Sequence, residues 1–345
     1  MPRLGVDKFG GLLRAGVADA GNDHRLGANE APPAIMSIYL GEYLSNLVDE
    51  ISGLAKVNEQ SVAQISMGVR NLPRIAKDVS DRNRTSPIAF TGNKFEFRAV
   101  GSSQNPSEAL TTLNLLVAYG YYMIELRLAK RIGEDIKESA ISVLKDVFNA
   151  TRRIRFEGNG YSSDWHREAK QRGLPNARNT PEALETYLQK DVIELLEKAK
   201  VLSARELTAK VEIKLENYIK TKEIEYKTAV NLARTQFIPA LTKQIGSLAI
   251  AAAALKTAGI TFSVLSAELK RFNELFNEIK DSADVLENLF HRAEKTSDPH
   301  KRARLFASEG EKALASLRFS VDAAEGIVSA EFWPMAKYQE LLTIL

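Results

Sequence analysis

From Asn105 nearly to its end, the chain carries apolar residues at helical spacing and repeated helix-start signals. Two runs recur every three or four residues: Ile136, Ala140, Val143, Leu144, Val147 and Phe148, and then Leu269, Phe272, Phe276, Ile279, Ala283, Leu286 and Phe290. Helix starts are predicted at Asn105-Pro106, Thr180-Pro181, Ser203 with Glu206 as a capping box, and Asp298-Pro299. This pattern predicts core-facing stripes, and therefore a long helical bundle.

The first hundred residues differ in composition from the rest of the chain. They are rich in Gly, Asn and Pro, and turn motifs interrupt them at short intervals. One segment, residues 94–100, alternates aromatic and ionisable side chains, which is the period of a strand. We expect a strand from about Phe95 to Val100, with residues 87–91 as its candidate partner. The predicted fold class is α+β, mostly α, with short antiparallel strands before the bundle.

Charge and residue usage exclude several classes of protein. Lys and Arg number 47 and Asp and Glu 44, a balance that predicts neither nucleic acid nor a membrane as the partner, and any anion site must be local. The absence of Cys removes disulfides and thiolate metal sites and fits a reducing cytosol, so we expect a cytoplasmic location. The four His residues offer no pair at i, i+4, so a zinc enzyme is not expected.

No segment reads as a targeting or membrane-spanning element. The N-terminus lacks an apolar core of signal-peptide length. The most apolar stretch, residues 248–255, is far shorter than the about 20 residues that cross a bilayer. We interpret it as a buried helix segment whose alanines suit close helix packing.

Glu96 and Arg98 form the most informative pair of ionisable residues. Two positions apart on a strand, they leave the same face with their Cα atoms about 6.5 to 7 Å apart. A carboxylate can hold Mg²⁺ or Mn²⁺ while a guanidinium binds phosphoryl or carboxylate oxygens beside it. The alternative is a surface ion pair worth under about 1 kcal/mol.

Two upstream loops also carry charged side chains. Arg82 and Arg84 lie among small hydroxyl residues just before the expected strand pair, where they form either an anion clamp or a solvated basic loop. Arg25 and Glu30 flank a Gly- and Asn-containing loop that ends at two prolines. Such a loop is either a lid over a site or a plain connection.

These residues resemble a known family, the type III branch of glutamine synthetase. Residues 22–33 (NDHRLGANEAPP) are similar to its flap region, and residues 83–103 (NRTSPIAFTGNKFEFRAVGSS) to its arginine motif and metal-binding strand. The resemblance continues through residues 159–163, 172–176 and 180–184 and Trp333-Pro334, in the helical extension that marks this branch. It covers nearly the whole chain and implies that residues 1–125 end a catalytic domain and 126–345 form the extension.

The resemblance implies ATP-dependent joining of ammonia to glutamate through γ-glutamyl phosphate, with Mg²⁺ or Mn²⁺. Glu96 is similar to the family's metal ligand, and Arg98 to an arginine that binds the substrate carboxylate or the phosphoryl group. Arg84 resembles the arginine that stabilises phosphoryl charge. Arg25 resembles the arginine that holds glutamate, and Glu30 the flap glutamate that closes over the intermediate.

One position departs from shorter branches, where another arginine follows five residues after the one matched by Arg84. Here that residue is Ala89, and Lys94 is the candidate nearby cation, assigned to cofactor binding. Nothing resembles the family's β-grasp domain or its paired metal-binding glutamates. The chain is therefore interpreted as a C-terminal half, inactive alone, that acts in a homo-oligomer or with an upstream half. The alternative is a non-catalytic helical oligomerisation or interaction protein derived from the family.

Overall fold

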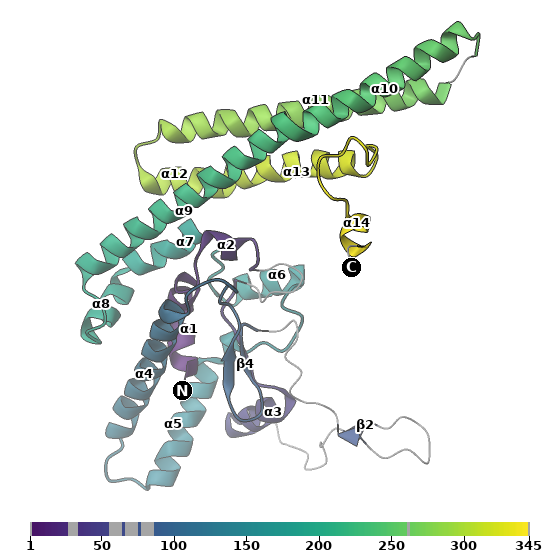
Figure 1. Cartoon of the computed structure of the whole chain (residues 1–345). Helices are drawn as coiled ribbons and strands as arrows, with labels where there is room; N and C mark the ends of the chain where they lie inside the picture. Colours follow the sequence, from purple (N-terminus) through teal and green to yellow (C-terminus); the bar gives the residue numbers. More distant parts are fainter. Residues whose placement is uncertain are drawn as a thin grey trace, which may run out of the picture. The chain divides into compact units, whose positions relative to one another are not determined.

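The computed structural model describes residues 2–26, 34–54, 64–65, 75–76, 86–260 and 263–343, and it divides into two compact units (Figure 1). Unit 1 is Met1–Val211 and unit 2 is Glu212–Leu345. Helices dominate and the sheets are small, which confirms the α+β, mostly α class. The two compact units divide at residue 211, far beyond residue 125. The predicted boundary at residue 125 is a different one, because it marks where the family's helical extension begins, and it stays a prediction.

Unit 1 combines short helices with one small sheet. Its helices are α1 (Pro2–Ala15), α2 (Ala20–Asp23), α3 (Glu42–Ile51), α4 (Ser107–Ala129), α5 (Ile136–Ala150), α6 (Ser163–Gln171), α7 (Thr180–Leu184) and α8 (Lys190–Lys198), with 3₁₀ helices η1 (Arg152–Ile154) and η2 (Glu185–Leu188). Its strands are β1 (Ile38–Tyr39), β2 (Gln64–Ile65), β3 (Ile75–Ala76), β4 (Ile88–Phe90) and β5 (Phe95–Phe97).

The three-stranded sheet has the order β1-β4-β5, with β1 parallel and β5 antiparallel to β4. The predicted pairing of the β5 segment with residues 87–91 is confirmed, and Ala89 lies opposite Glu96. The strand ends at Phe97 rather than Val100. One more ladder bond forms, from the Arg98 N–H to the Pro87 carbonyl at 2.9 Å, but Pro87 has no N–H to return, and the ladder stops there.

The core of unit 1 lies where α1 packs against α4, with α5 beside α4 (Figure 1). The two main helices approach closely, since a Cβ on Gly5 would lie 2.4 Å from the Leu116 carbonyl oxygen. Val143 and Val147 of α5 are buried as the periodicity predicts. The prediction that Ile136 faces the core is wrong, because this residue lies in the first turn of α5 and is 78% exposed.

Every regular element among the described residues of unit 2 is a helix. The unit contains most of α9 (Ala204–Leu232), followed by the π-helix η3 (Ala233–Phe237), α10 (Ile238–Thr257), α11 (Ser263–Glu294), α12 (Pro299–Leu305), the π-helix η4 (Phe306–Gly310), α13 (Glu311–Glu325) and α14 (Tyr338–Thr343). Helices α10 and α13 both pack against α11 (Figure 1).

The long stripe predicted on α11 forms the core of unit 2. Phe272, Ile279, Ala283 and Leu286 are buried, with Phe290 at the end of the same face. The predicted caps are also present. Ser203 and Glu206 bond each other's backbone N–H groups at the start of α9, and the Asp298 carboxylate accepts from the His300 and Lys301 N–H groups at the start of α12.

The segment 248–255 is not the buried segment that its composition predicts. It lies in the second half of α10, where Ile250 is 74% exposed and only Leu248, Ala252 and Leu255 are half-buried. Those three residues lie on one face of the helix. Most other residues of the segment are exposed, because an alanine side chain is small and gains little from burial. By length and composition alone, the continuous helix from Ala204 to Thr257 could cross a membrane, since its best 18-residue window has a mean hydropathy of 1.4 and is 11% buried.

Candidate functional site

Strand β5 places three of the predicted site residues next to one another in sequence and space. Glu96 is half-buried in the strand, and Arg98 follows its last residue. The Nζ of Lys94 lies 3.6 Å from Oε1 of Glu96, with side chains 63% and 26% exposed. A carboxylate in β5 is therefore flanked in sequence by a cation on each side of the strand, and its side chain is 26% exposed.

Arg25 contacts the segment that follows β5, 75 positions further along the chain. It follows α2, and its Nη1 donates to the Val100 carbonyl at 3.1 Å. Asn22, at 2% exposure, donates from Nδ2 to the Val17 and Ala99 carbonyls, both at 2.9 Å. These bonds fix the turn that carries Arg25 beside residues 99 and 100, and a site shared by Arg25, Glu96 and Arg98 stays a prediction.

A buried ion pair holds that turn from its other side. Asp23 accepts from Arg14 Nη2 at 3.0 Å, from the Thr180 N–H at 2.6 Å and from the Thr180 hydroxyl at 2.9 Å. Arg14 is 1% exposed, and its Nε donates to the Ala177 carbonyl at 3.0 Å. The start of α7 thus anchors the base of the Arg25 turn.

Burial dominates the electrostatics of this pair. Loss of solvent raises the pKa of Asp23 above its ordinary value, although Arg14 and Thr180 act in the opposite direction. Burial likewise lowers the pKa of Arg14, and Asp23 offsets part of that shift. Sequence reasoning missed this contact, because residues 22–33 and the Thr180 helix start each look significant alone and no pattern shows that they meet.

Two of the predicted site residues, Glu30 and Arg84, lie outside the described residues. Within the described part of the chain, no group of three His, Asp or Glu side chains could hold a metal ion. Glu96 fits as one oxygen ligand of a divalent ion, and Lys94, Arg25 and Arg98 fit as cations near a phosphate or carboxylate. These residues can therefore supply one metal ligand and three cations to a site for a divalent ion and an anion. The described residues do not form a complete metal site by themselves.

Comparison with known proteins gives one family. Residues 139–256 match the model of the glutamine synthetase C-terminal domain. The chain is 37% identical to a glutamine synthetase of Bacteroides fragilis, 36% to a type-3 glutamine synthetase of Dictyostelium discoideum, and 30% to a glutamine synthetase of Butyrivibrio fibrisolvens. Each alignment covers 98% of this chain and 47 or 48% of the relative. The chain spans about half the length of the curated relatives it matches.

Proposed function

Because the chain belongs to the glutamine synthetase family, we propose that it supplies the C-terminal part of a type III enzyme that amidates glutamate with ammonia and ATP through γ-glutamyl phosphate. The observation that carries the proposal is similarity along 98% of the chain, together with the Arg25 turn bonded to the residues after β5. The non-catalytic alternative is not favoured, since the relatives reported above are named glutamine synthetases.

Each candidate side chain has a role that its chemistry can perform. Arg25 and Arg98 bind the carboxylate of glutamate, since a guanidinium fork matches two carboxylate oxygens. Glu30 closes over the intermediate and takes a proton from ammonium, while Arg84 stabilises the charge on the phosphoryl group. The buried Asn22 holds the Arg25 turn in place, so that bound glutamate keeps a fixed position relative to strand β5.

Glu96 is proposed as one ligand of Mg²⁺ or Mn²⁺, and Lys94 as a cation for the phosphates of ATP. A bound divalent ion would neutralise phosphoryl charge when ATP is present. Lys94 Nζ lies 3.6 Å from the Glu96 carboxylate, so a phosphate bound beside the metal lies within reach of the same cation. One ligand and a few cations do not complete such a site, so the chain alone is expected to be inactive. We propose that it acts in the cytoplasm, in a homo-oligomer or with an upstream half.

The test is a chimera in which this chain replaces the aligned part of the Bacteroides fragilis relative. The chimera is expected to form glutamine from glutamate, ammonia and ATP, whereas the isolated chain releases no phosphate. Glutamine formation by the isolated chain, or an assembled but inactive chimera, would contradict the proposal.

Matched variants in the chimera test the individual roles. Glu96→Gln keeps the shape of the side chain and removes its charge, so activity should fall by about a hundredfold or more with weaker Mn²⁺ binding. Arg167→Gln serves as the control, because that arginine is 75% exposed on α6 and, among the residues that the structure describes, forms an ion pair with Asp164 alone. Equal activity in Glu96→Gln and in the control would remove Glu96 from the site.

A further inference from the structure

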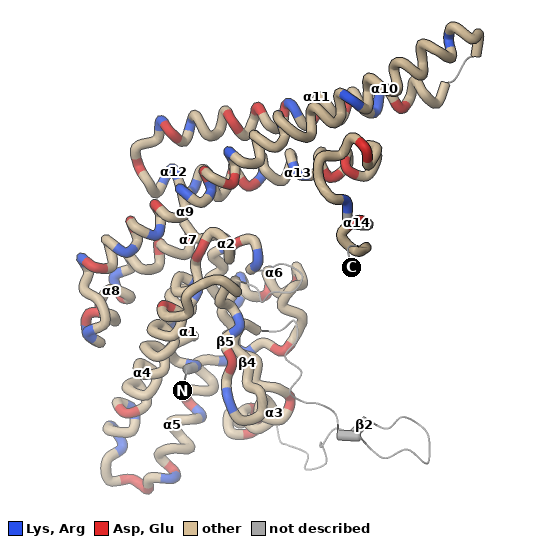
Figure 2. The backbone as a smooth tube through the Cα atoms, in the orientation of Figure 1, with Lys and Arg blue, Asp and Glu red and all other residues tan. Residues whose placement is uncertain are grey.

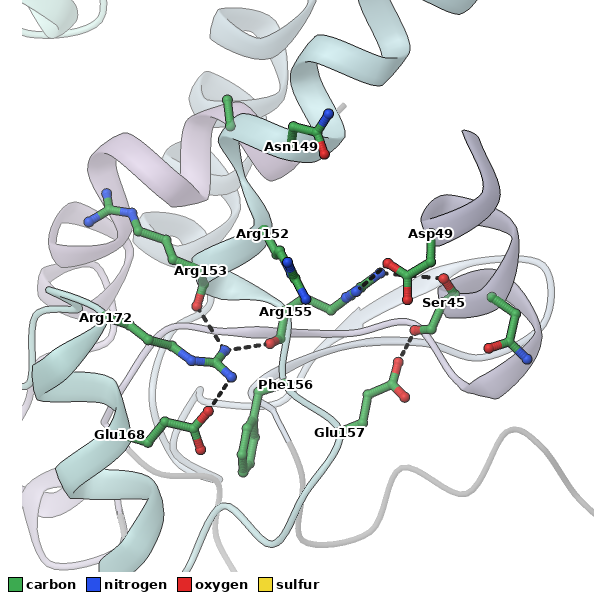
Figure 3. Close-up of a pocket in the computed structure, with 12 residues that line it drawn as sticks. Ser45, Asp49, Asn149, Arg152, Arg153, Arg155, Phe156, Glu157, Glu168 and Arg172 are labelled. Atoms are coloured by element: carbon green, nitrogen blue, oxygen red, sulfur yellow. Dashed lines mark hydrogen bonds and ion pairs between the residues drawn. The ribbon is translucent and has the colours of Figure 1, made fainter. Parts of the chain in front are cut away.

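A second cluster of arginines lies at the other edge of the small sheet, away from β5. Arg155 forms a bridge with Ile38 of β1, so it continues the sheet on the side opposite Glu96. Around it lies a cavity of about 800 Å³, lined by four arginines between the ends of α3, α5 and α6 (Figure 3). None of these arginines belongs to the site predicted around β5.

Three of the arginines already have carboxylate partners. Arg155 Nη2 lies 2.6 Å from Asp49 Oδ1, Arg153 Nε lies 2.8 Å from Asp7 Oδ1, and Arg172 contacts Glu168. Figure 3 shows the Arg153 side chain turned away from the other arginines. These pairs fix the wall of the cavity and neutralise three of the guanidinium groups.

Arg152 is different, because it is exposed and lines the cavity without an ion pair to any residue that the structure describes. It follows directly on α5, within the short η1 helix that also holds Arg153. The remaining lining carboxylate, Glu157, contacts the Ser45 hydroxyl instead of an arginine. The cavity therefore presents a guanidinium that is free to bind a ligand.

A fifth arginine lies buried behind this wall. Arg3 is 6% exposed, and neither of its terminal nitrogens has a hydrogen-bond partner among the described residues. Its guanidinium stacks over the Phe148 ring, 5.0 Å from the centroid, at the end of α5 that borders the cavity. Burial, and then the charge of Arg155, lowers the pKa of Arg3 to about 10, while Asp7 and Asp49 act in the opposite direction.

Buried guanidinium groups without partners are costly, and an anion between them removes the cost. Counting Arg3 with the four lining arginines gives five positive charges, against four negative charges on Asp7, Asp49, Glu157 and Glu168. We propose that this cavity binds a small oxyanion, a phosphate or carboxylate group, that Arg152 holds directly and that the buried charge of Arg3 stabilises from behind the wall. The proposed site goes beyond the ligase function and is independent of it.

The experiment titrates the full chain with inorganic phosphate and, separately, with succinate, at constant ionic strength. Binding is followed by calorimetry and by the ¹⁵N shifts of the arginine Nε groups. We expect saturable binding with a shift of the Arg152 signal. The stronger of the two probes identifies whether a phosphate or a carboxylate is the natural group.

Three variants decide the outcome. Arg152→Gln should weaken binding about tenfold, the size of a lost charge-assisted hydrogen bond, and it should fold normally because the residue is exposed. Arg3→Met should weaken binding without lowering the melting temperature, because it removes an unpaired buried charge. Arg167→Gln, outside the cavity, should bind as the wild type does. The absence of saturable binding, or equal affinity in Arg152→Gln and Arg167→Gln, would overturn the site.

Discussion

The two units of the chain stabilise their folds by different means. Unit 1 buries charged and amide side chains in its interior, including Arg3, Arg14 and Asn22, and the last two fix turns through their hydrogen bonds. Unit 2 relies on an apolar stripe along α11, while most of its ion pairs join exposed side chains. Figure 2 shows that its Lys, Arg, Asp and Glu residues are spread along the helices. The difference indicates that unit 1 positions a site, where exact loop placement matters, and that unit 2 is a scaffold of packed helices.

The largest expected effect is the loss of Asp23 in unit 1. Asp23→Ala leaves the Arg14 guanidinium, at 1% exposure, without its carboxylate, which should cost about 3–5 kcal/mol of the free energy of unfolding. Trp165 and Trp333 are the only tryptophans, one in each unit, so a Trp333→Phe background reports on unit 1 alone. Urea unfolding followed by Trp165 fluorescence measures the change.

The matched control lies in unit 2. Asp322 pairs with Arg318 on α13, where the two side chains are 51% and 77% exposed. Asp322→Ala should change stability by less than about 1 kcal/mol, because solvent screens the pair. If both variants lose the same stability, the contrast between buried and surface ion pairs is wrong.

The next effect concerns close packing in unit 2. Gly310 ends the π-helix η4, and a Cβ there would lie 2.6 Å from Cε2 and from the hydroxyl oxygen of Tyr226. That hydroxyl donates to the Phe306 carbonyl at 2.9 Å and is itself buried, so the ring cannot yield freely. Gly310→Ala should destabilise unit 2 by about 1–3 kcal/mol, measured by Trp333 fluorescence in a Trp165→Phe background.

Gly246 provides the control for that substitution. It lies in α10, and a Cβ there would meet no atom within 4 Å. Gly246→Ala should therefore stabilise the helix by up to about 1 kcal/mol, because alanine is the better helix former. Destabilisation of similar size by both variants would mean that helix geometry, and not the contact with Tyr226, decides the outcome.

Alkaline pH should act on unit 1 through Tyr187. Burial, with a contribution from Glu108, raises the pKa of this phenol above its ordinary value. The unfolded tyrosine ionises near pH 10 while the folded one keeps its proton, so stability is present below pH 10 and is lost as the pH rises further. At pH 11 the loss should reach about 1.4 kcal/mol.

Tyr187→Phe removes this loss, so its stability relative to the wild type should improve between pH 9 and pH 11. Urea midpoints across that range measure the change. Tyr121→Phe, where the ring is 60% exposed on α4, should show no such trend. A parallel pH dependence in wild type and Tyr187→Phe would exclude Tyr187 as the cause.

The sequence predicts those elements whose signal is local. Capping at Asp298, the Ser203 capping box and the α11 stripe depend on residues within a few positions, and all three are present. The β4–β5 pairing was also predictable, because its two strands are joined by a short turn at Gly92.

Contacts between distant segments were not predictable in this way. Asp23 meets Thr180 across 157 positions, and Arg3 lies over Phe148 without any motif to mark either contact. Of the candidate site, the sequence predicts the side chains on β5 and the Arg25 turn, but the ion pair that anchors the turn depends on tertiary packing. The cavity at Arg152 was missed for the same reason.

The smallest expected effect tests the apolar segment of α10, where composition misled the sequence analysis. Ile250 is 74% exposed, so Ile250→Ala should change the stability of unit 2 by no more than about 0.5 kcal/mol. Ile279 of α11 is fully buried, and Ile279→Ala should cost about 2–5 kcal/mol through lost burial and the cavity left behind. Comparable losses from both, measured by Trp333 fluorescence in dilute solution, would show that the α10 segment is covered after all. If Ile250→Ala loses stability only at higher protein concentration, the segment is instead covered by a second copy of the chain.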